Sequence, residues 1–344
     1  MANIKDVARA SGVSPTTVSF VLNNTGAVGP VTRERVLRAA KLLRYHPSAV
    51  ARGLLHKRMN TVGVVFSNPD PAPISNPYFA PILDGITLAA GRHRQNAMLF
   101  TGQAWSDADH SLPFFSDGRC DGLILVGMHT HTDIIPSLLE RGTPFVLINN
   151  RWDDARVSWV DSDDEASAFA ATGYLLSLGH RRIAMLAGED FVGCVGRRNA
   201  GYRSALAGAG LAHAEMVLPG GFFEPSITER LKQALSLPPS ERPTALLCTT
   251  DAMAVDAVQS LLQLGIRVPE DVSVIAHDDT ALAAACPPGL TAMRQPFRRM
   301  GERAVDILLT QIENDAPVGC RELFPTELIV RQSVAQVLTR NTHA

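Results

Sequence analysis

The sequence predicts two kinds of fold in one chain: a small all-α module at the N-terminus, followed by a longer α/β domain of doubly wound parallel sheets. Within the first sixty residues, apolar side chains recur at helical spacing. After residue 60, short β-branched runs alternate with amphipathic stretches. At 344 residues the chain also exceeds one ordinary domain, so more than one folding unit is expected.

The first predicted helix covers residues 4–10, and Gly12 supplies the turn that follows it. Ser14 is a favourable N-cap, and Pro15 suits the first position of a second short helix. Two short helices joined in this way predict a helix-turn-helix. The apolar side chains that would pack them together are Ile4, Val7, Ala8, Val18, Val21 and Leu22.

The second helix would be the recognition helix in the DNA major groove. A third helix is predicted after Gly29 and Pro30, with an apolar stripe formed by Val36, Ala39, Ala40 and Leu43. A purely structural three-helix bundle would explain the apolar residues equally well. The candidates for contact with DNA are Pro15, Thr16, Thr17, Ser19 and Phe20 on the outward face, together with Asn23.

The charge distribution favours the DNA-binding interpretation. Residues 1–59 carry ten Lys and Arg against two Asp and Glu, a net charge of +8. Since the whole chain carries −2, the remaining residues must carry −10. A basic module on an acidic body is typical of a protein whose one end meets phosphates.

The body of the chain alternates predicted strands and helices, which favours parallel sheets covered on both faces. The predicted strands are 61–66, 97–101, 122–126, 145–149, 183–187, 245–249 and 272–276. The predicted helices are 81–91, 166–178, 199–209 and 253–264. Ligands of such sheets bind where strands end, so polar residues at those points are candidates. They are Asn149, Asn150 and Arg151, the Asp278–Asp279 pair, and Arg197 with Arg198.

Long segments of the chain resemble the LacI/GalR family of bacterial repressors. The first are NIKDVARASGVSPTTVSFVLN and VTRERVLRAAKLLRYHPSAVARGL, and others follow in family order: SNPYF, SLGHRRIAML, RRNAGYRSAL, TTDAMAVDAV, RVPEDVSVIAHDD, LTAMRQP and PTELIVRQS. The resemblance spans residues 2 to about 335. It implies a cytoplasmic homodimer that binds a pseudo-palindromic DNA operator, most simply as a repressor, and that responds to a small effector held between two lobes like those of periplasmic sugar-binding proteins.

The resemblance also implies a domain organisation. The expected parts are a headpiece (1–46), a hinge helix and linker (47–59), and a sensing domain (60–338). Its first lobe would comprise about 60–160 and 291–322, and its second lobe about 161–290 and 323–338. In the family the leucine at the position of Leu54 is wedged into the minor groove, a mechanism that kinks DNA. The hinge residues expected to contact DNA are Ser48, Ala51, Arg52, Leu54 and Leu55.

Carried over by motif position, Arg198 and Asp278 match the polar clamp that holds ligand hydroxyls in sugar-responsive relatives. Phe223 matches an aromatic that packs on the ligand ring. A bidentate cation, a carboxylate, amides and one apolar face suit a polyol. The further expected ligand residues are Asn76, Tyr78, Phe79, Asn149, Asn150 and Asp251.

Two departures from the family limit what can be carried over. Phe20 stands where arginine or another polar residue is common, and it offers apolar contact in place of bidentate binding to guanine. Pro15 also lacks a polar group. In the sensing domain, His277, Val192 and Cys194 depart from the usual pattern. A sugar or sugar derivative is the leading effector, with a nucleobase or small acid as alternatives, and the sequence leaves open whether the effector releases or recruits the protein.

Other classes of protein fit less well. The segment from Gly208 to His213 lacks the third glycine of a dinucleotide-binding loop, and neither a P-loop nor a nucleophile elbow occurs, so no enzyme and no cofactor are expected. His129 and His131 lack evident partners for a metal. A periplasmic solute receptor would match the body, but the first residues do not resemble a signal peptide and no apolar run is long enough to span a membrane. The five widely spaced cysteines indicate reduced thiols.

Overall fold

The computed structural model describes residues 2–46, 53, 58–66, 74–102, 107–127, 132–188, 193–220 and 227–337. The chain divides into two compact units. One consists of Met1–Thr61 with Gly118–Asp121, and the other of Val62–Asp117 with Gly122–Ala344.

The smaller unit contains the three predicted helices, which are α1 (Ile4–Ser11), α2 (Pro15–Leu22) and α3 (Pro30–Leu42). Asn3 and Asp6 form a capping box at the start of α1, and Gly12 ends the helix in a left-handed conformation with φ of 65°. The side chain of Ser14 accepts a hydrogen bond from the backbone N–H of Thr17, as an N-cap should. The predicted helix-turn-helix is confirmed.

The core of this unit is built from small and β-branched side chains: Val7, Ala8, Val18, Val21, Val36, Ala39 and Ala40. Ile4 and Leu22 are only partly buried against it. Leu43 was expected in the apolar stripe of the third helix, but it follows the end of α3 and is 37% exposed.

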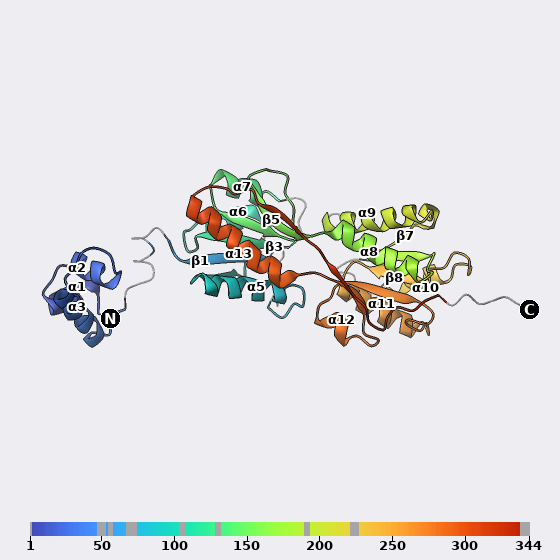
Figure 1. Cartoon of the computed structure of the whole chain (residues 1–344), viewed down its shortest axis with the longest axis horizontal. Coiled ribbons are helices and arrows are strands. Elements are labelled where there is room, and N and C mark those ends of the chain that lie inside the picture. The colour runs from blue at the N-terminus through green and yellow to red at the C-terminus, as the bar shows by residue number, and fades with distance from the viewer. Residues whose placement is uncertain are drawn as a thin grey trace, which may run out of the picture. The chain divides into compact units, whose positions relative to one another are not determined.

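The larger unit contains two six-stranded sheets, each with helices packed against it (Figure 1). The first sheet has the order β11-β5-β4-β3-β1-β2 and forms what we call the first lobe. Its strands are β1 (Thr61–Phe66), β2 (Asn96–Phe100), β3 (Gly122–Val126), β4 (Phe145–Ile148), β5 (Ser158–Ser162) and β11 (Arg321–Phe324). Its helices are α5 (Phe79–Arg92), α6 (Ala108–Phe115), α7 (Ile134–Glu140) and α13 (Phe297–Asn314).

The second sheet has the order β12-β10-β9-β8-β6-β7 and forms the second lobe. Its strands are β6 (Ile183–Ala187), β7 (Met216–Pro219), β8 (Ala245–Cys248), β9 (Ser273–Asp278), β10 (Thr291–Arg294) and β12 (Glu327–Ile329). Its helical elements are α8 (Asp164–Ser177), α9 (Gly193–Gly208), η1 (Ala212–Ala214), α10 (Thr228–Leu235), α11 (Asp251–Gln263) and α12 (Ala281–Ala285). The sheet is parallel except at β12, which pairs antiparallel with β10.

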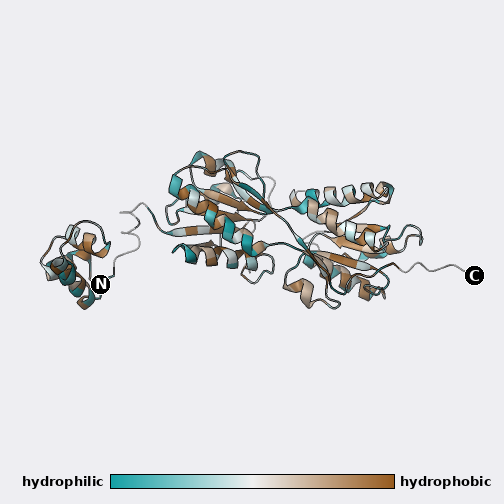
Figure 2. Ribbon diagram, viewed as in Figure 1, coloured by the Kyte–Doolittle hydropathy of each residue, from teal (hydrophilic) through white to brown (hydrophobic). Residues whose placement is uncertain are grey.

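Central strands such as β1, β3, β4, β6 and β8 are apolar and buried because helices cover both faces of each sheet, as their colouring in Figure 2 shows. In the first lobe, α5 and α13 approach each other closely. A Cβ added at Gly85 would lie 2.1 Å from the carbonyl oxygen of Arg298, and one at Gly301 would lie 2.3 Å from that of Ile82. These two glycines therefore allow the backbones of the helices to touch.

The chain passes between the two lobes three times, in what we call the crossover segments (Figure 1). They are Asp163, Gln295–Pro296 and Pro325–Thr326. These crossings lie two to five residues later than the expected lobe limits, because β5 continues to residue 162, β10 belongs to the second sheet, and β11 reaches residue 324. Residues 291–294 form β10, which pairs parallel with β9 of the second sheet and was not among the predicted strands.

Candidate functional site

The outward face of α2 is the candidate DNA-reading surface. Pro15 and Thr16 are exposed, and the ring-bearing side chain of Phe20 is 43% exposed. Thr17 is turned toward the N-cap, with its hydroxyl 2.9 Å from that of Ser14. Of the six side chains predicted to contact DNA from this region, three are exposed: Pro15, Thr16 and Phe20.

The other two predicted reader residues are bound to each other. The Asn23 amide donates a hydrogen bond to the Ser19 hydroxyl at 3.1 Å, and both side chains are half-buried. The Phe20 ring also packs closely against Gly26. A Cβ added at Gly26 would lie only 3.0 Å from two of the ring atoms. Gly26 has φ of 73°, a conformation that favours glycine. The turn after α2 thus helps to orient Phe20.

The predicted hinge contacts lie outside the described residues. These are Ser48, Ala51, Arg52, Leu54 and Leu55. The same holds for Phe223, expected to pack on the ligand, and for Val192 and the His129–His131 pair.

In the first lobe, an aromatic cluster lies at the carboxyl end of β1 and the start of α5. The ring of Phe79 is 4.6 Å from that of Phe66, and Tyr78 contacts both Phe79 and Phe297 edge-on at 5.1 and 4.9 Å. Asn76 acts on this cluster locally, because its side-chain carbonyl accepts the backbone N–H of Tyr78 at 3.0 Å. That side chain therefore holds the turn that carries Tyr78.

Asn149 reaches the same cluster from the end of β4. Its amide N–H donates to the Tyr78 hydroxyl, and its backbone is left-handed with φ of 58°. Its side chain is buried, and its Oδ1 atom has no hydrogen-bond partner among the described residues. A buried unpaired acceptor is costly unless another group satisfies it. Asn150, the next residue, is also buried.

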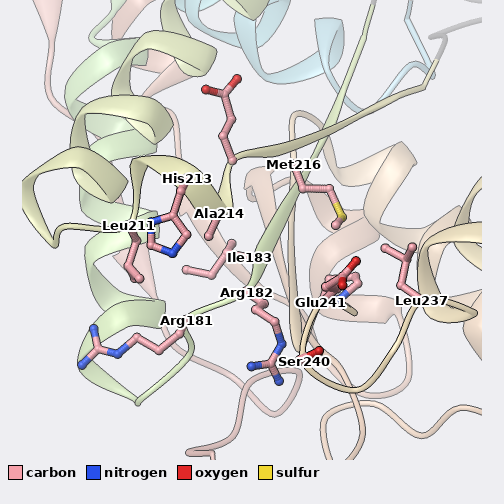
Figure 3. A pocket seen from close by; sticks show the side chains of 12 residues that line it. Arg181, Arg182, Ile183, Leu211, His213, Ala214, Met216, Leu237, Ser240 and Glu241 are labelled. Atoms are coloured by element: carbon pink, nitrogen blue, oxygen red, sulfur yellow. The ribbon is translucent and has the colours of Figure 1, made fainter.

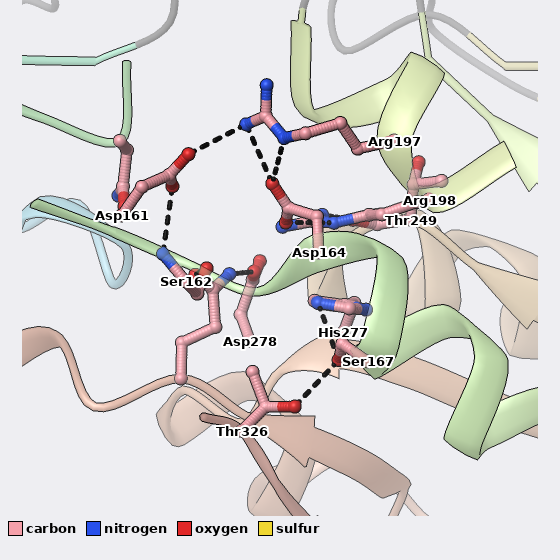
Figure 4. Close-up of polar contacts among 12 residues, drawn as sticks. Asp161, Ser162, Asp164, Ser167, Arg197, Arg198, Thr249, His277, Asp278 and Thr326 are labelled. Carbon is pink, nitrogen blue, oxygen red and sulfur yellow. Dashed lines mark hydrogen bonds and ion pairs between the residues drawn. The ribbon is translucent and has the colours of Figure 1, made fainter. Parts of the chain in front are cut away.

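In the second lobe, the two predicted clamp residues Arg198 and Asp278 are both buried. The Arg198 guanidinium, on α9, lies 2.9 Å from the Asp164 carboxylate and also donates to the carbonyl of Thr249 (Figure 4). Asp278 accepts a hydrogen bond from the Gln295 amide at 2.6 Å. The start of α8 places Asp164 beside α9.

Asp164 belongs to a buried ion network around the first crossover segment (Figure 4). Arg197 lies 2.8 Å from both Asp164 and Asp161, and Arg151 of the first lobe lies 2.7 Å from Asp161. Sequence reasoning missed Asp161 and Asp164. Both aspartates lie at or just after the end of the short strand β5 (Ser158–Ser162), where ligand residues are expected. Recognising β5 as a strand in the sequence would have made them candidates.

Burial shifts the protonation equilibria of this region. It raises the pKa of Asp161 to about 6, with the nearby Asp164 charge adding to the effect. It also raises the pKa of Asp278 well above its ordinary range, and the neighbouring Asp251 contributes. The pKa of Tyr78 is raised by burial and then by the Asp278 charge, so these two side chains from different lobes lie within electrostatic reach of each other.

Asp251, another predicted ligand residue, holds the turn that carries Asp278. Its carboxylate accepts hydrogen bonds from the backbone N–H of Asp279 and Thr280 and from the Thr280 hydroxyl. Asp278 and Asp279 both have positive φ, 117° and 58°, so this turn needs support. In this structure Asp251 therefore holds the backbone of the turn that carries Asp278.

His277 precedes Asp278 and is also buried. Its Nε2 atom lies 3.3 Å from the Ser167 hydroxyl, which accepts a hydrogen bond from Thr326 at 2.9 Å (Figure 4). Burial lowers the pKa of His277 well below 6.5, and the Arg198 charge lowers it further. Its imidazole is neutral at physiological pH.

A pocket of about 420 Å³ lies elsewhere, at the amino ends of β6 and β7 (Figure 3). Its charged lining carries both signs, from Arg181, Arg182 and His213 to Glu215 and Glu241. It contains none of the predicted ligand residues. Because ligands of doubly wound sheets bind at the carboxyl ends of strands, the residues around Tyr78 and Asp278 remain the candidate site.

The described part of the chain contains no group of three or more His, Cys, Asp or Glu side chains that could hold a metal ion. None of its helices combines the length and the apolar composition needed to cross a membrane.

The architecture is that of a two-part regulator, with a DNA-binding headpiece and a two-lobed α/β domain. Residues 3–48 match the family described as bacterial regulatory proteins, lacI family, and residues 172–334 match the periplasmic binding protein-like domain. The HTH-type transcriptional repressor PurR of Aliivibrio fischeri (strain MJ11) is 36% identical over 97% of this chain and 98% of its own length. PurR of Erwinia tasmaniensis is 37% identical, covering 97% of each chain.

Solved structures agree with this assignment. A transcriptional regulator CelR–cellobiose complex is 31% identical, with a TM-score of 0.71, over 97% of this chain and 100% of that one. The lac repressor dimer bound to operator and the anti-inducer ONPF is 26% identical, with a TM-score of 0.81, over 97% and 99% of the two chains. The chain belongs to the lacI family of bacterial regulatory proteins. It is a DNA-binding transcriptional regulator and not an enzyme, as the sequence predicted.

Proposed function

We propose that this regulator is a cytoplasmic homodimeric repressor of a pseudo-palindromic operator, controlled by a sugar or sugar-like effector bound between the lobes. The proposal is carried by the Tyr78–Asn149 hydrogen bond in the first lobe and the buried Asp278 at the end of β9 in the second, both at carboxyl ends of strands. An aromatic wall, an amide acceptor without a partner and a carboxyl group suit a small polar ring with hydroxyls. The CelR relative in complex with cellobiose supports this class of effector.

In this proposal residues 47–59 form a hinge that links the headpiece to the sensing domain, with Leu54 entering the minor groove at the operator centre. Ligand-dependent reorientation of the lobes would change the spacing of the two hinges in the dimer. Such a coupling between sites typically changes affinity about 5- to 150-fold.

A nucleobase is the second candidate effector. The relatives of 36–37% identity over nearly the full chain are repressors named PurR, whereas CelR is 31% identical. The flat aromatic surface beside an amide would suit a heterocyclic ring as well as a sugar. A small acid is less suited, because Asp161, Asp164 and Asp278 all lie near the site.

Thermal-shift measurements with cellobiose, D-ribose, hypoxanthine and guanine would separate these classes, followed by operator binding with each compound that shifts the melting temperature. The operator itself can be obtained by selecting bound duplexes from a random pool. Asp278→Ala is expected to weaken binding of the active compound at least about tenfold, because it removes a hydrogen bond between the compound and a buried carboxyl group. Asp271→Ala is a suitable control, because that carboxylate pairs with Arg267 on the surface.

Arg198→Ala should also abolish binding, whereas Arg203→Ala, on the outer side of the same helix and paired with Glu215, should not. Unchanged binding in both Asp278→Ala and Arg198→Ala would place the effector elsewhere.

A further inference from the structure

The Gln295 side chain joins the two lobes at the second crossover segment. It is buried, with 5% of its surface exposed. Its Oε1 atom accepts a hydrogen bond from the hydroxyl of Ser162, the last residue of β5 in the first lobe. Its Nε2 atom donates to the Oδ1 atom of Asp278, the last residue of β9 in the second lobe, at 2.6 Å. One planar amide therefore links the carboxyl ends of strands in both sheets.

The backbone of Gln295 strengthens the same link, since its N–H donates to the carbonyl of Asp278 at 3.1 Å. The residue before Asp278 makes an independent connection, from His277 through Ser167 to Thr326. Thr326 lies in the third crossover segment, and Ser162 directly precedes the first. The end of β9 is thus connected by hydrogen bonds to all three crossover regions (Figure 4).

From this arrangement we infer that Gln295 is a positioning residue that couples occupation of Asp278 to the orientation of the lobes. The inference rests on the proposed function, in which Asp278 binds the effector. An effector hydroxyl at Asp278 competes with Gln295 for the same carboxyl group. The oxygen and the nitrogen of the Gln295 amide are bonded to the same carbon. If the amide rotates when its hydrogen bond to Asp278 changes, its hydrogen bond to Ser162 must therefore change as well.

The chain offers a matched control in Gln311. This glutamine is also buried, at 4% exposed, and also bonds a serine at a strand of the first sheet, with its Nε2 atom 2.8 Å from the hydroxyl of Ser158. It lies within α13 and joins only parts of the first lobe. Gln295→Leu and Gln311→Leu therefore remove comparable buried amides, and only the first removes a link between lobes.

The experiment uses the full-length protein, its selected operator, and whichever of cellobiose, D-ribose, hypoxanthine or guanine shifts the wild-type melting temperature. In Gln295→Leu, we expect the affinity of the protein for that compound to change less than about threefold. The compound should then change the operator affinity of this variant less than about twofold, whereas coupling between two sites usually changes affinity about 5- to 150-fold. Gln311→Leu should keep the wild-type response. Gln295→Glu retains the acceptor for Ser162 and serves if the leucine variant does not fold.

Two results would overturn the inference. One is a full operator response in Gln295→Leu, and the other is a loss of compound binding as large as in Asp278→Ala, which would make Gln295 a ligand contact. A wild-type protein that responds to none of the four compounds would instead contradict the proposed effector classes.

In that case a ligand-free double-mutant cycle decides the inference. Ser162→Ala and Asp278→Ala should have non-additive effects on urea unfolding in the wild type and additive effects in Gln295→Leu. Additivity in both backgrounds overturns the coupling role.

Discussion

The guanidinium of Arg198 lies 2.9 Å from the carboxylate of Asp164, and both side chains are almost completely buried. Arg197 and Asp161 extend this pair into a network that also includes Arg151 of the first lobe. The candidate clamp residue is therefore held in place by an acidic partner at the start of α8. This relationship has consequences for stability that can be measured.

Asp164→Ala should destabilise the sensing domain by about 3–5 kcal/mol, because it leaves a buried guanidinium without its partner. The double variant Asp164→Ala/Arg198→Met should recover part of that loss, since it removes both charges. Urea unfolding at pH 7 measures both effects. Equal losses in the single and double variants would contradict this explanation, because removing the unpaired guanidinium would then recover nothing.

The pH dependence of stability should carry the signature of Asp161. Its folded-state pKa of about 6 lies above the ordinary 3.8, so between about pH 4 and pH 6 the folded chain binds this proton more tightly than the unfolded chain does. The contribution of Asp161 to the free energy of unfolding is therefore present at low pH and is lost as the pH rises through that window. Asp251, with a pKa also near 6, acts in the same direction.

Asp161→Asn removes one of these titrations. Between pH 4.5 and pH 7 the free energy of unfolding of the variant should therefore change less than that of the wild type. The difference should be on the order of 1.4 kcal/mol for each unit by which the pKa of Asp161 is shifted. Asp154→Asn is the control, because the half-buried Asp154 has a pKa lowered to about 2 by hydrogen bonds from Arg156 and titrates below the window. Parallel pH profiles for wild type and Asp161→Asn would contradict the prediction.

Phe20→Arg should change the sequence preference of the headpiece more than its overall affinity for DNA. Arginine can bind guanine bidentately, a contact worth about 1–3 kcal/mol of discrimination, whereas phenylalanine offers apolar contact. Binding-site selection with each protein measures the preference. Leu42→Arg adds the same charge at an exposed position of α3, 78% exposed, and should leave the preferred sequence unchanged. If the selected sites of Phe20→Arg match those of the wild type, Phe20 does not read bases.

Gly85→Ala should destabilise the first lobe, because its Cβ would lie 2.1 Å from a backbone oxygen of α13 and neither helix backbone can yield easily. A loss of at least about 2 kcal/mol is expected from such overpacking. Gly91→Ala, on the same helix but with nothing within 4 Å of the added Cβ, should stabilise by about 0.5–1 kcal/mol. Thermal unfolding compares the two, and equal effects would exclude close packing as the cause.

Local sequence patterns were sufficient for the headpiece and for most buried strands. Apolar spacing predicted α1, and Gly12 and Ser14 predicted the turn and the start of α2, because they act through neighbours only three or four residues away. Most of the seven predicted strands, such as β1 and β3, are apolar runs because both faces of the strand are buried. The strands missed were β5, β7, β10, β11 and β12, which are short or interrupted by polar residues, and most of them lie at or next to a sheet edge.

The site shows the same division. The sequence by itself determined which residue types stand at strand ends, including Asn149 and Asp278, because a strand end is a local feature. Only the tertiary structure decided how the site residues pair: Arg198, which lies within α9, with Asp164, and Asp278 with Gln295, a residue of the second crossover segment. These partners come together only when three separate chain crossings are folded side by side, and spacing along the chain carries no information about that contact.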